Sequence, residues 1–541
     1  MTFLVFWVCN LRKGLDEHPL RSTHLPPETN NLPLARCSAI AALLATVSYA
    51  ASGAVTLTVG PNVNISKSSG NNAEECIAIN PTNPNNLFAS ETWALVTKYS
   101  TNGGVAWNNS NVSALPSSIG DVAAAWDNFG NLFLVRFGTS DRVAVGLSTN
   151  GGASFSLLFQ TSSANTDQPS VATGPSSVAG QGSVWITYTD SSGRLIARGA
   201  AVTGLGAVGS FGASQSAPGP GGDFGDIAIG PTGQVMVVYQ DQSSGVGPDT
   251  ILLNLDTNGL ASGGFGSASN ATTTQVGAFA PIPAQPLREI DAEAGLAWDR
   301  SGGPRNGRVY LVYTDRPSTS SADTDIYVRF SDNNGATWSS RVRVNDDPAG
   351  NGQSQFLPRI ALDQTSGNVA VSFYDCRNSP SNNAVEVWAT VSTDGGLSFL
   401  PNVKVSAGVS SALVSAIRST SFDFGDYTGL AFHAGTFYPC WADNSNSTGD
   451  NPAGAQSTFD IYTARVTVNP PLVMVNPRFN NATFRVSVQT VAGKTYFLES
   501  SPSLASPAWT VAATIAGDGT LKGLVDNNAA APQKFYRIRA Q

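Results

Sequence analysis

The amino-acid sequence predicts an all-β protein: a β-propeller of seven blades (six possible), followed by a small β-sandwich domain. Two repeats support this fold class. A turn motif with a fixed spacing of Ser, Asn or Asp, Gly and an aromatic residue occurs four times, and an alanine within an apolar strand recurs seven times. The composition agrees, because only 13% of the 541 residues are charged and 54 are glycine. Such a chain suits short strands and polar turns better than helices.

The turn motif is clearest at Ser331–Trp338, which reads SDNNGATW. A short Asn side chain can accept hydrogen bonds from its own turn, Gly provides a positive φ, and the aromatic ring can fold back onto the sheet. The motif resembles the Asp-box, or BNR repeat, of the sialidase-like β-propellers in the sialidase/neuraminidase superfamily. The matching residues of the four copies are Ser100, Asn102, Gly104 and Trp107; Ser148, Asn150, Gly152 and Phe155; Ser331, Asn333, Gly335 and Trp338; and Ser392, Asp394, Gly396 and Phe399. The motif closes a turn, so it indicates architecture rather than chemistry.

The second repeat is an apolar residue followed by Ala, and it marks the innermost strand of each expected blade. Its alanines are Ala78, Ala125, Ala172, Ala228, Ala297, Ala361 and Ala431. In the sixth unit the pattern predicts strands at 359–363, 368–374, 385–392 and 403–405. A four-stranded meander that recurs in this way is typical of a propeller blade.

The ends of the repeat region predict how the ring closes. The seventh unit stops one strand short at 459–468, whereas residues 55–66 form a strand without a sheet of its own. We expect the N-terminal strand to complete the last blade, since closure removes an exposed sheet edge. The propeller is therefore expected over residues 51–468.

Beyond the propeller, residues 469–474 are expected to form a linker and residues 475–541 a β-sandwich. The strand-like segment at 495–500, Trp509 and the aromatic, basic C-terminal strand resemble a small C-terminal β module of secreted bacterial proteins. Modules of that type imply attachment or sorting, and a stabilising cap is the alternative.

Residues 1–50 predict a leader that contains a signal peptide. Its apolar run, residues 37–50, is too short to span a bilayer permanently, and small residues suited to signal peptidase follow it. The leader predicts a bacterial protein that is secreted into the extracellular space or the periplasm and does not span a membrane.

Composition also narrows the chemistry. A formal net charge of −8 argues against nucleic acid as a partner. Of the three histidines, only His433 lies beyond residue 50, which excludes a multi-histidine zinc site. No cofactor is required, although Ca²⁺ could act as a structural ion in the oxygen-rich loop Asp443–Asp460. Cys76, Cys376 and Cys440 suit either buried thiols or one disulfide bond.

Candidate site residues precede the first strands or follow the second strands of the blades, where the loops surround a central funnel. The candidates for catalysis are Tyr427, Glu293, Asp375 and Asp426. The candidates for substrate binding are Arg288, Arg359, Arg418 and Arg377, since converging arginines bind a carboxylate with bidentate hydrogen bonds. The resemblance to sialidases implies a Tyr–Glu nucleophile, an Asp acid/base and an arginine triad. The Phe-Arg-Ile-Pro signature of that family is absent ahead of the first turn motif.

These observations favour recognition of a glycan or polysaccharide at the funnel, which could extend to glycoside hydrolysis of the exo-sialidase type. A non-catalytic propeller for adhesion or protein binding is one alternative. Another polysaccharide-cleaving propeller, a xyloglucanase-like hydrolase or a lyase, is the second. The oligomeric state stays open, with a monomer as the default expectation.

Overall fold

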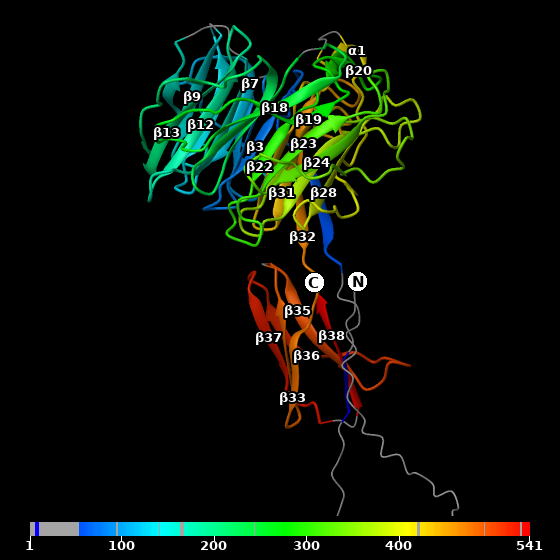
Figure 1. Cartoon of the computed structure of the whole chain (residues 1–541). Coiled ribbons are helices and arrows are strands. Elements are labelled where there is room, and N and C mark those ends of the chain that lie inside the picture. The colour runs from blue at the N-terminus through cyan, green and yellow to red at the C-terminus, as the bar shows by residue number, and fades with distance from the viewer. Residues whose placement is uncertain are drawn as a thin grey trace, which may run out of the picture. The chain divides into compact units, whose positions relative to one another are not determined.

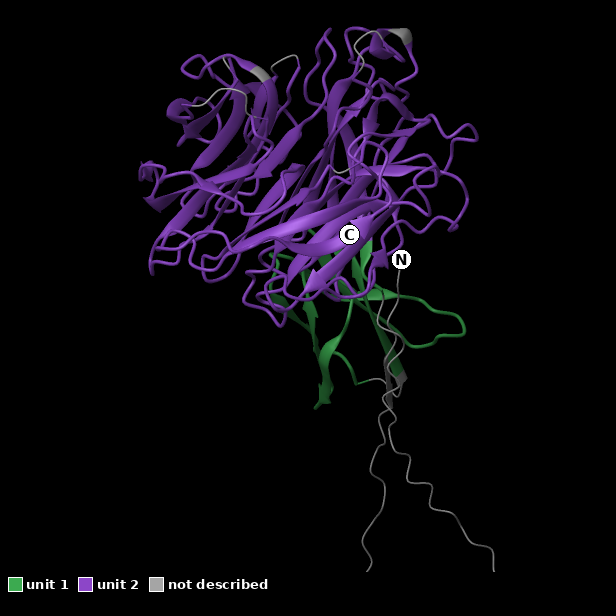
Figure 2. Ribbon diagram, turned by 45° about the horizontal axis from the view of Figure 1, so that its top comes forward, with its two compact units in different colours: residues 1–56, 469–541 green, residues 57–468 purple. Residues whose placement is uncertain are grey.

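The computed structural model describes residues 6–9, 54–93, 96–139, 141–162, 167–242, 244–418, 422–491, 493–530 and 533–541. Apart from Phe6–Cys9, the predicted leader lies outside the described residues. The described chain is all-β, as predicted, and its one helix is the four-residue α1 (Ser415–Arg418) (Figure 1). None of its helices has the length and apolarity that a membrane span requires. It divides into two compact units, residues 57–468 and residues 1–56 with 469–541 (Figure 2).

The described part of the larger unit contains seven antiparallel sheets of four or five strands, one for each alanine repeat, and one two-stranded hairpin. Their first strands are β3 (Cys76–Ile79), β7 (Ser118–Trp126), β11 (Asp167–Pro175), β16 (Asp223–Ile229), β22 (Gly295–Trp298), β26 (Gln355–Leu362) and β30 (Gly429–His433). Each first strand contacts that of the next sheet, and β30 contacts β3, so the order of contacts is cyclic. The seven repeat alanines lie on these strands.

The remaining strands of each sheet follow in chain order, as in a meander. The second strands are β4 (Leu87–Ser90), β8 (Leu132–Gly138), β12 (Gly182–Thr189), β17 (Val235–Gln240), β23 (Val309–Asp315), β27 (Val369–Asp375) and β31 (Thr436–Asp443). The third strands are β5 (Thr97–Ser100), β9 (Arg142–Ser148), β13 (Leu195–Gly204), β18 (Asp249–Asp256), β24 (Asp325–Ser331), β28 (Glu386–Ser392) and β32 (Asp460–Asn469). The outer strands are β6 (Asn108–Asn109), β10 (Ser156–Gln160), β14 (Ala207–Val208), β15 (Gln215–Ser216), β19 (Ser269–Thr274), β25 (Val342–Arg343) and β29 (Val403–Lys404).

The outer strand of the seventh sheet comes from the start of the chain. Strand β2 (Thr56–Asn64) pairs with β32, and just beyond it the N–H of Ile65 donates to the carbonyl of Ile461 at 2.7 Å. Strands far apart in the sequence thus share one sheet, as the incomplete last repeat predicts. This pairing covers the edge of β32 that would otherwise be open.

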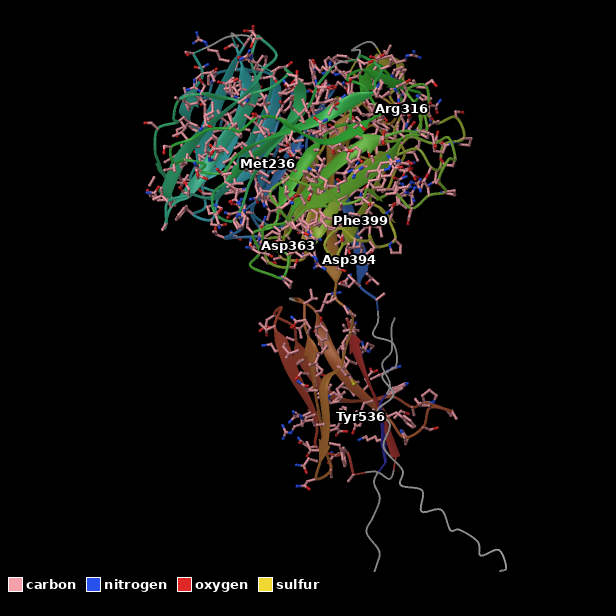
Figure 3. The ribbon with its side chains drawn as sticks, in the orientation of Figure 1. Met236, Arg316, Asp363, Asp394, Phe399 and Tyr536 are labelled. Atoms are coloured by element: carbon pink, nitrogen blue, oxygen red, sulfur yellow. The ribbon has the colours of Figure 1, made fainter. Side chains whose placement is uncertain are left out.

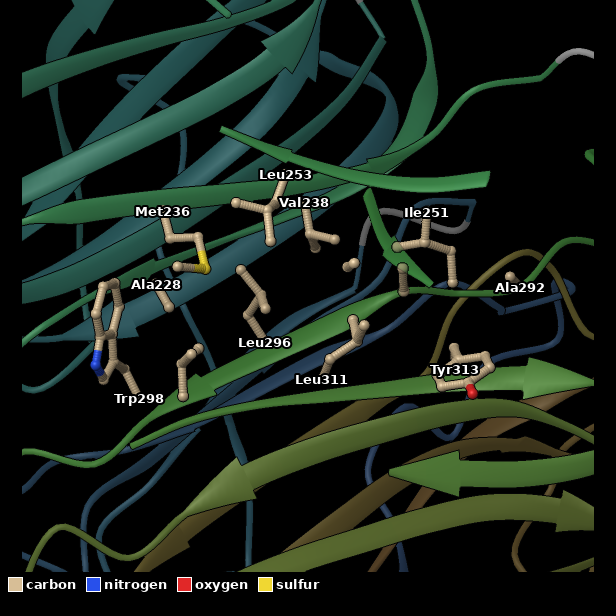
Figure 4. Close-up of a cluster of buried hydrophobic side chains, with 13 residues drawn as sticks. Ala228, Met236, Val238, Ile251, Leu253, Ala292, Leu296, Trp298, Leu311 and Tyr313 are labelled. Carbon is tan, nitrogen blue, oxygen red and sulfur yellow. The ribbon is translucent and has the colours of Figure 1, made fainter. Parts of the chain in front are cut away.

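Apolar side chains of neighbouring sheets form the cores. In one cluster Met236, Val238 and Leu253 of one sheet face Leu296 and Leu311 of the next (Figure 4). These residues are almost fully buried. Two sheets that pack through alternate, inward-facing residues bury them from water and fix the position of each first strand.

The four turn motifs share one hydrogen-bond pattern, and its local geometry follows the prediction. In each turn the Ser hydroxyl donates to the Asn or Asp side chain and accepts from the Gly N–H, at 2.9 Å for both bonds of Ser331. The glycines have φ near the 82° of Gly335. Figure 3 shows Asp394 and Phe399, from the fourth turn, toward the end of the unit where Asp363 lies, and Arg316 toward the other end. The turns therefore mark one end of the unit.

The smaller unit consists of two sheets around a separate core. One sheet has the order β1 (Phe6–Cys9), β38 (Gln533–Ala540), β35 (Thr495–Ser501) and β36 (Thr510–Ala516), and the other the order β33 (Val475–Asn480), β34 (Thr483–Gln489) and β37 (Leu521–Asp526). Phe484 and Tyr536 stack with ring centroids 4.0 Å apart, and the Tyr536 hydroxyl donates to Asp526 at 2.8 Å. Both sheets contribute residues to this core.

Candidate functional site

Acidic side chains stand where the first strands of the sheets begin. Six of the seven repeats carry an acid four or five residues before the repeat alanine, and two further acids lie close by. We call this set the acidic mouth; it consists of Glu74, Asp121, Asp167, Asp223, Asp226, Asp291, Glu293 and Asp426. Since the first strands contact one another in a closed cycle, their starts bring these carboxyl groups together.

The backbone at this position is bent in a way that five repeats share. The residue four places before the alanine has a left-handed φ in these repeats, at Glu74, Gln168, Phe224, Glu293 and Leu357. In β11, β16 and β26 the strand register shifts beside it, as in a β-bulge. A left-handed non-glycine residue costs on the order of 1–3 kcal/mol. The packing around each bulge must therefore offset this strain, and the bulge changes the direction of the neighbouring side chain.

Two arginines tie the acidic mouth together across sheets. The Arg288 guanidinium makes a bidentate pair with Asp426, with Nε 2.6 Å from Oδ1, and its Nη2 lies 3.7 Å from Glu74 Oε1. Arg359 Nη1 lies 3.4 Å from Glu293 Oε1, and its Nη2 lies 3.8 Å from Asp226 Oδ1. Each arginine thus contacts carboxylates from two other repeats. Both are already paired with acids of the protein itself.

Burial and crowding raise the pKa values of several carboxyl groups of the acidic mouth. Burial, together with the charge and hydrogen bond of Asp167, raises the pKa of Asp121 to about 8. Burial raises the pKa of Glu293 to about 8 although Arg359 lowers it, and burial raises the pKa of Asp223 to about 6. Asp167, in contrast, is exposed to solvent. A buried, protonated acid and a solvent-exposed acid thus lie next to each other.

Tyr427, the predicted nucleophile, is part of this cluster but its hydroxyl is already engaged. It accepts a hydrogen bond from the Val122 N–H at 3.0 Å and lies 3.3 Å from Thr92 Oγ1. Burial, then the charges of Asp121 and Glu74, raise the pKa of Tyr427 well above its usual value. The phenol is therefore neutral and connects three repeats.

A hairpin inserted before the fifth repeat reaches across to the seventh. It consists of β20 (Ala280–Ile282) and β21 (Gln285–Ile290), and Figure 1 shows β20 at the end of the unit where α1 lies. The backbone N–H groups of Leu287 and Arg288 donate to Asp423 Oδ2 at 2.7 and 3.0 Å. The hairpin carries Arg288 to Asp426, so its docking completes the mouth.

Aromatic side chains border the acidic mouth. Trp93 is 39% exposed, and its ring centroid lies 3.7 Å from that of Phe422, over which Arg288 is placed at 5.1 Å. Trp93 follows Thr92, whose hydroxyl meets Tyr427. Exposed aromatic faces beside polar groups are the usual lining of a site for a polar organic ligand.

The structure brings five of the eight predicted residues together and leaves three apart. Tyr427, Glu293, Asp426, Arg288 and Arg359 meet at the acidic mouth. Asp375 and Arg377 instead pair with each other at 2.8 Å in the sixth sheet, where Arg377 also contacts Asp346 and stacks on Trp388. Arg418 is exposed on α1, and its charge acts on Asp423.

The calcium prediction concerns a loop whose flanking acids already have protein donors. Asp460 accepts from Asn64, Ser66 and Ser68, and Asp443 accepts from Trp441 and Ser445. Within the described part of the chain no group of three His, Cys, Asp or Glu side chains is placed to hold a metal ion. Calcium in this loop stays a prediction. The described cysteines Cys76, Cys376 and Cys440 are free thiols.

The sequence-based candidates did not include six acids of the mouth, which are Glu74, Asp121, Asp167, Asp223, Asp226 and Asp291. A signal for the first four was present, because each stands four or five residues before a repeat alanine. Acids that recur in several repeats suggest a structural role when each sheet is considered alone. They form one site only because the ring joins them.

Comparisons with known proteins give distant likenesses. No protein-family model matches the chain, and no curated protein matches it. Among solved structures it is similar to a protein of unknown function from Dyadobacter fermentans DSM 18053, with 10% identity over 76% of this chain and 99% of that one and a TM-score of 0.40. It is also similar to a Penicillium chrysogenum alpha-L-arabinanase complexed with arabinobiose (12% identity, 65% and 93% covered, TM-score 0.38) and to AofleA from Arthrobotrys oligospora (8%, 65% and 91%, 0.38).

Proposed function

We propose that the larger unit is a seven-bladed propeller of an exported protein that binds a glycan at the acidic mouth and hydrolyses its glycosidic bond. One observation carries this proposal. Asp121, which burial holds protonated, lies in the same mouth as Asp426, which is ion-paired with Arg288, and the exposed Trp93 borders that mouth. Glycoside hydrolysis needs one protonated and one ionised carboxyl group beside a bound sugar.

In this mechanism Asp121 is the general acid. Its proton passes to the glycosidic oxygen as the bond to the anomeric carbon breaks, and the pKa of about 8 keeps that proton in place at neutral pH. Asp426 is the second carboxylate; burial raises its pKa, and the hydrogen bond and charge of Arg288 oppose that shift and favour the ionised form. It either attacks the anomeric carbon to form a glycosyl ester, which water then hydrolyses while giving a proton back to Asp121, or it deprotonates the water that attacks directly.

The substrate that suits this mouth is a neutral or basic sugar. A sialic acid would bring a further carboxylate into a partly dehydrated mouth where crowding already keeps acids such as Asp121 and Glu293 from ionising. A sialidase-type clamp needs arginines that are free to bind that carboxylate. Arg288 and Arg359 already contact Asp426, Glu74, Glu293 and Asp226. The exo-sialidase hypothesis is therefore less well supported than hydrolysis of a neutral polysaccharide.

The test is a screen of the purified full chain against neutral polysaccharides, chitosan oligosaccharides and fluorogenic sialosides. We expect release of reducing ends from a neutral or basic glycan, with Asp121→Asn and Asp426→Asn each reducing the rate by more than about 100-fold. Asp332→Asn, in the exposed turn at the other end of the unit, is the matched control. Binding of a glycan without turnover by the wild-type chain would favour the adhesion alternative. Cleavage of sialosides alone would contradict the proposed substrate class.

A further inference from the structure

The larger unit has a second opening at the opposite ends of its first strands. A cavity of about 830 Å³ lies there, and every one of the seven sheets contributes lining residues that follow or end its first strand. They include Trp126, Pro175, Pro231, Arg300, Gln364 and His433. The acidic mouth lies where the same strands begin, so the two sites are separated by the length of the strands. The volume is within the range that holds a ligand of one or two sugar rings.

Arg300 is the distinctive residue of this cavity. It follows β22, and its Nη1 crosses to the carbonyls of Thr173 and Ile229, two residues from other sheets, at 3.0 and 2.8 Å. Its backbone N–H donates to Gln364 Oε1 at 2.8 Å. Gly174 leaves room for the guanidinium, because a Cβ at that position would lie 2.7 Å from Nη1. The side chain is thus held in one place by three sheets.

The charge of Arg300 has no partner among the described residues. Burial alone acts on this group and lowers its pKa to about 10, with no carboxylate near enough to oppose that shift. The acid on the cavity wall, Asp127, is occupied by the N–H groups of Phe129 and Asn131 and by the Asn131 amide. Arg300 is half-buried, and withdrawing part of a guanidinium from water without a counter-charge is unfavourable. A bound anion would offset that cost.

The remaining wall suits a sugar. Phe129 presents an exposed aromatic face, with the edges of the buried Trp126 and Phe432 beside it. His433 adds an imidazole that burial keeps neutral, because burial lowers the pKa of this residue. Aromatic faces pack on the apolar face of a sugar ring, and a guanidinium matches the geometry of a carboxylate or phosphate. We propose that this cavity is a binding site for a saccharide of one or two rings that carries one acidic group, with that group on Arg300.

The proposal is tested by calorimetric titration of the full chain with glucuronate, glucose 6-phosphate and, as the neutral control, glucose. We expect both acidic sugars to bind the wild-type chain at one site. Glucose should bind the wild-type chain roughly 10- to 100-fold more weakly, and the acidic sugars should bind Arg300→Gln more weakly by the same factor. Comparing glucuronate with glucose 6-phosphate shows whether the site prefers a carboxylate or a phosphate. Equal affinity for glucose and glucuronate, or an unchanged affinity in Arg300→Gln, would overturn the proposal.

A second measurement covers the case in which Arg300→Gln fails to fold. Phenylglyoxal labels accessible arginines, and mass spectrometry locates the modified residues in the wild-type chain. Saturating glucuronate should protect Arg300 and leave the exposed Arg418 at the end of helix α1 labelled as before. Phe129→Ala, which changes the cavity wall without contacting the guanidinium, should weaken glucuronate binding about tenfold. Labelling of Arg300 that glucuronate does not change would contradict the site.

Discussion

Arg288 and Asp426 form a bidentate ion pair between a hairpin inserted before the fifth sheet and the loop that opens the seventh. The same guanidinium approaches Glu74 at the start of the first sheet. One side chain thus connects three parts of the ring that are remote in sequence. The pair also sets the charge of the acidic mouth, because it neutralises one of its carboxylates.

Arg288→Ala should therefore destabilise the larger unit. The substitution leaves the largely buried Asp426 without its counter-charge, and breaking one partner of such a pair costs about 3–5 kcal/mol. Urea unfolding followed by tryptophan fluorescence measures the loss. Arg418→Ala, on the exposed helix, is the control and should change the free energy of unfolding by less than about 0.5 kcal/mol. Equal stability of the two variants would show that the pair is not formed.

Asp121→Asn should change how stability depends on pH. The pKa of Asp121 is about 8 in the folded chain against 3.8 for an ordinary aspartate, so the folded state binds more protons between these values. The contribution of Asp121 to stability is complete below pH 3.8 and is lost as the pH rises toward 8. The melting temperature of Asp121→Asn relative to wild type should hence rise from pH 4.5 to pH 8. A difference that stays constant between these pH values would exclude the raised pKa of Asp121.

Trp93→Ala should weaken glycan binding without weakening the fold. Trp93 is 39% exposed beside the acidic mouth, so removing its ring takes away stacking surface and little buried area. A loss of about tenfold in affinity corresponds to one aromatic contact. Phe129→Ala is the matched control, because this partly exposed aromatic residue lies in the cavity at the other end of the strands. The same loss in both variants would mean that Trp93 is not specific to the mouth.

Ser331→Ala should destabilise the larger unit by about 1–2 kcal/mol. The buried hydroxyl donates to Asn333 and accepts from the buried Gly335 N–H, and an alanine leaves that N–H unsatisfied. Thermal unfolding by calorimetry measures the change, with the exposed Ser340→Ala as control. Catalysis should be unaffected, because the turn lies at the end of the unit away from the acidic mouth.

The repeats explain why much of the fold follows from the sequence. The turn chemistry at Ser331 and the alternating apolar residues around Ala361 are local properties, and they predict the strands of the sixth sheet within a few residues. The incomplete seventh repeat likewise predicts the pairing of β2 with β32. The turn motif and the apolar alternation depend only on residues that are close in the sequence. The pairing of β2 with β32 follows from the one strand that the seventh repeat lacks.

The site was less predictable, since it depends on contacts between remote repeats. Asp375 and Arg377 have the residue types expected of a site, yet they pair with each other inside one sheet. Glu74 and Asp121 resemble repeated scaffold acids in the sequence and gain their raised pKa values only when the ring buries them together. Neither the hairpin that carries Arg288 nor the left-handed bulges have a local sequence signal that indicates their destination.

The central claim is that the acidic mouth hydrolyses a glycosidic bond with Asp121 as the proton donor. The measurement that tests it most directly is the pH dependence of kcat/KM on the best neutral or basic oligosaccharide, for the wild-type chain and for Asp121→Asn. The wild-type rate should fall above about pH 8 as the acid loses its proton, and the variant should lose both most of the rate and this alkaline limb. An unchanged rate and pH profile in Asp121→Asn would contradict the account.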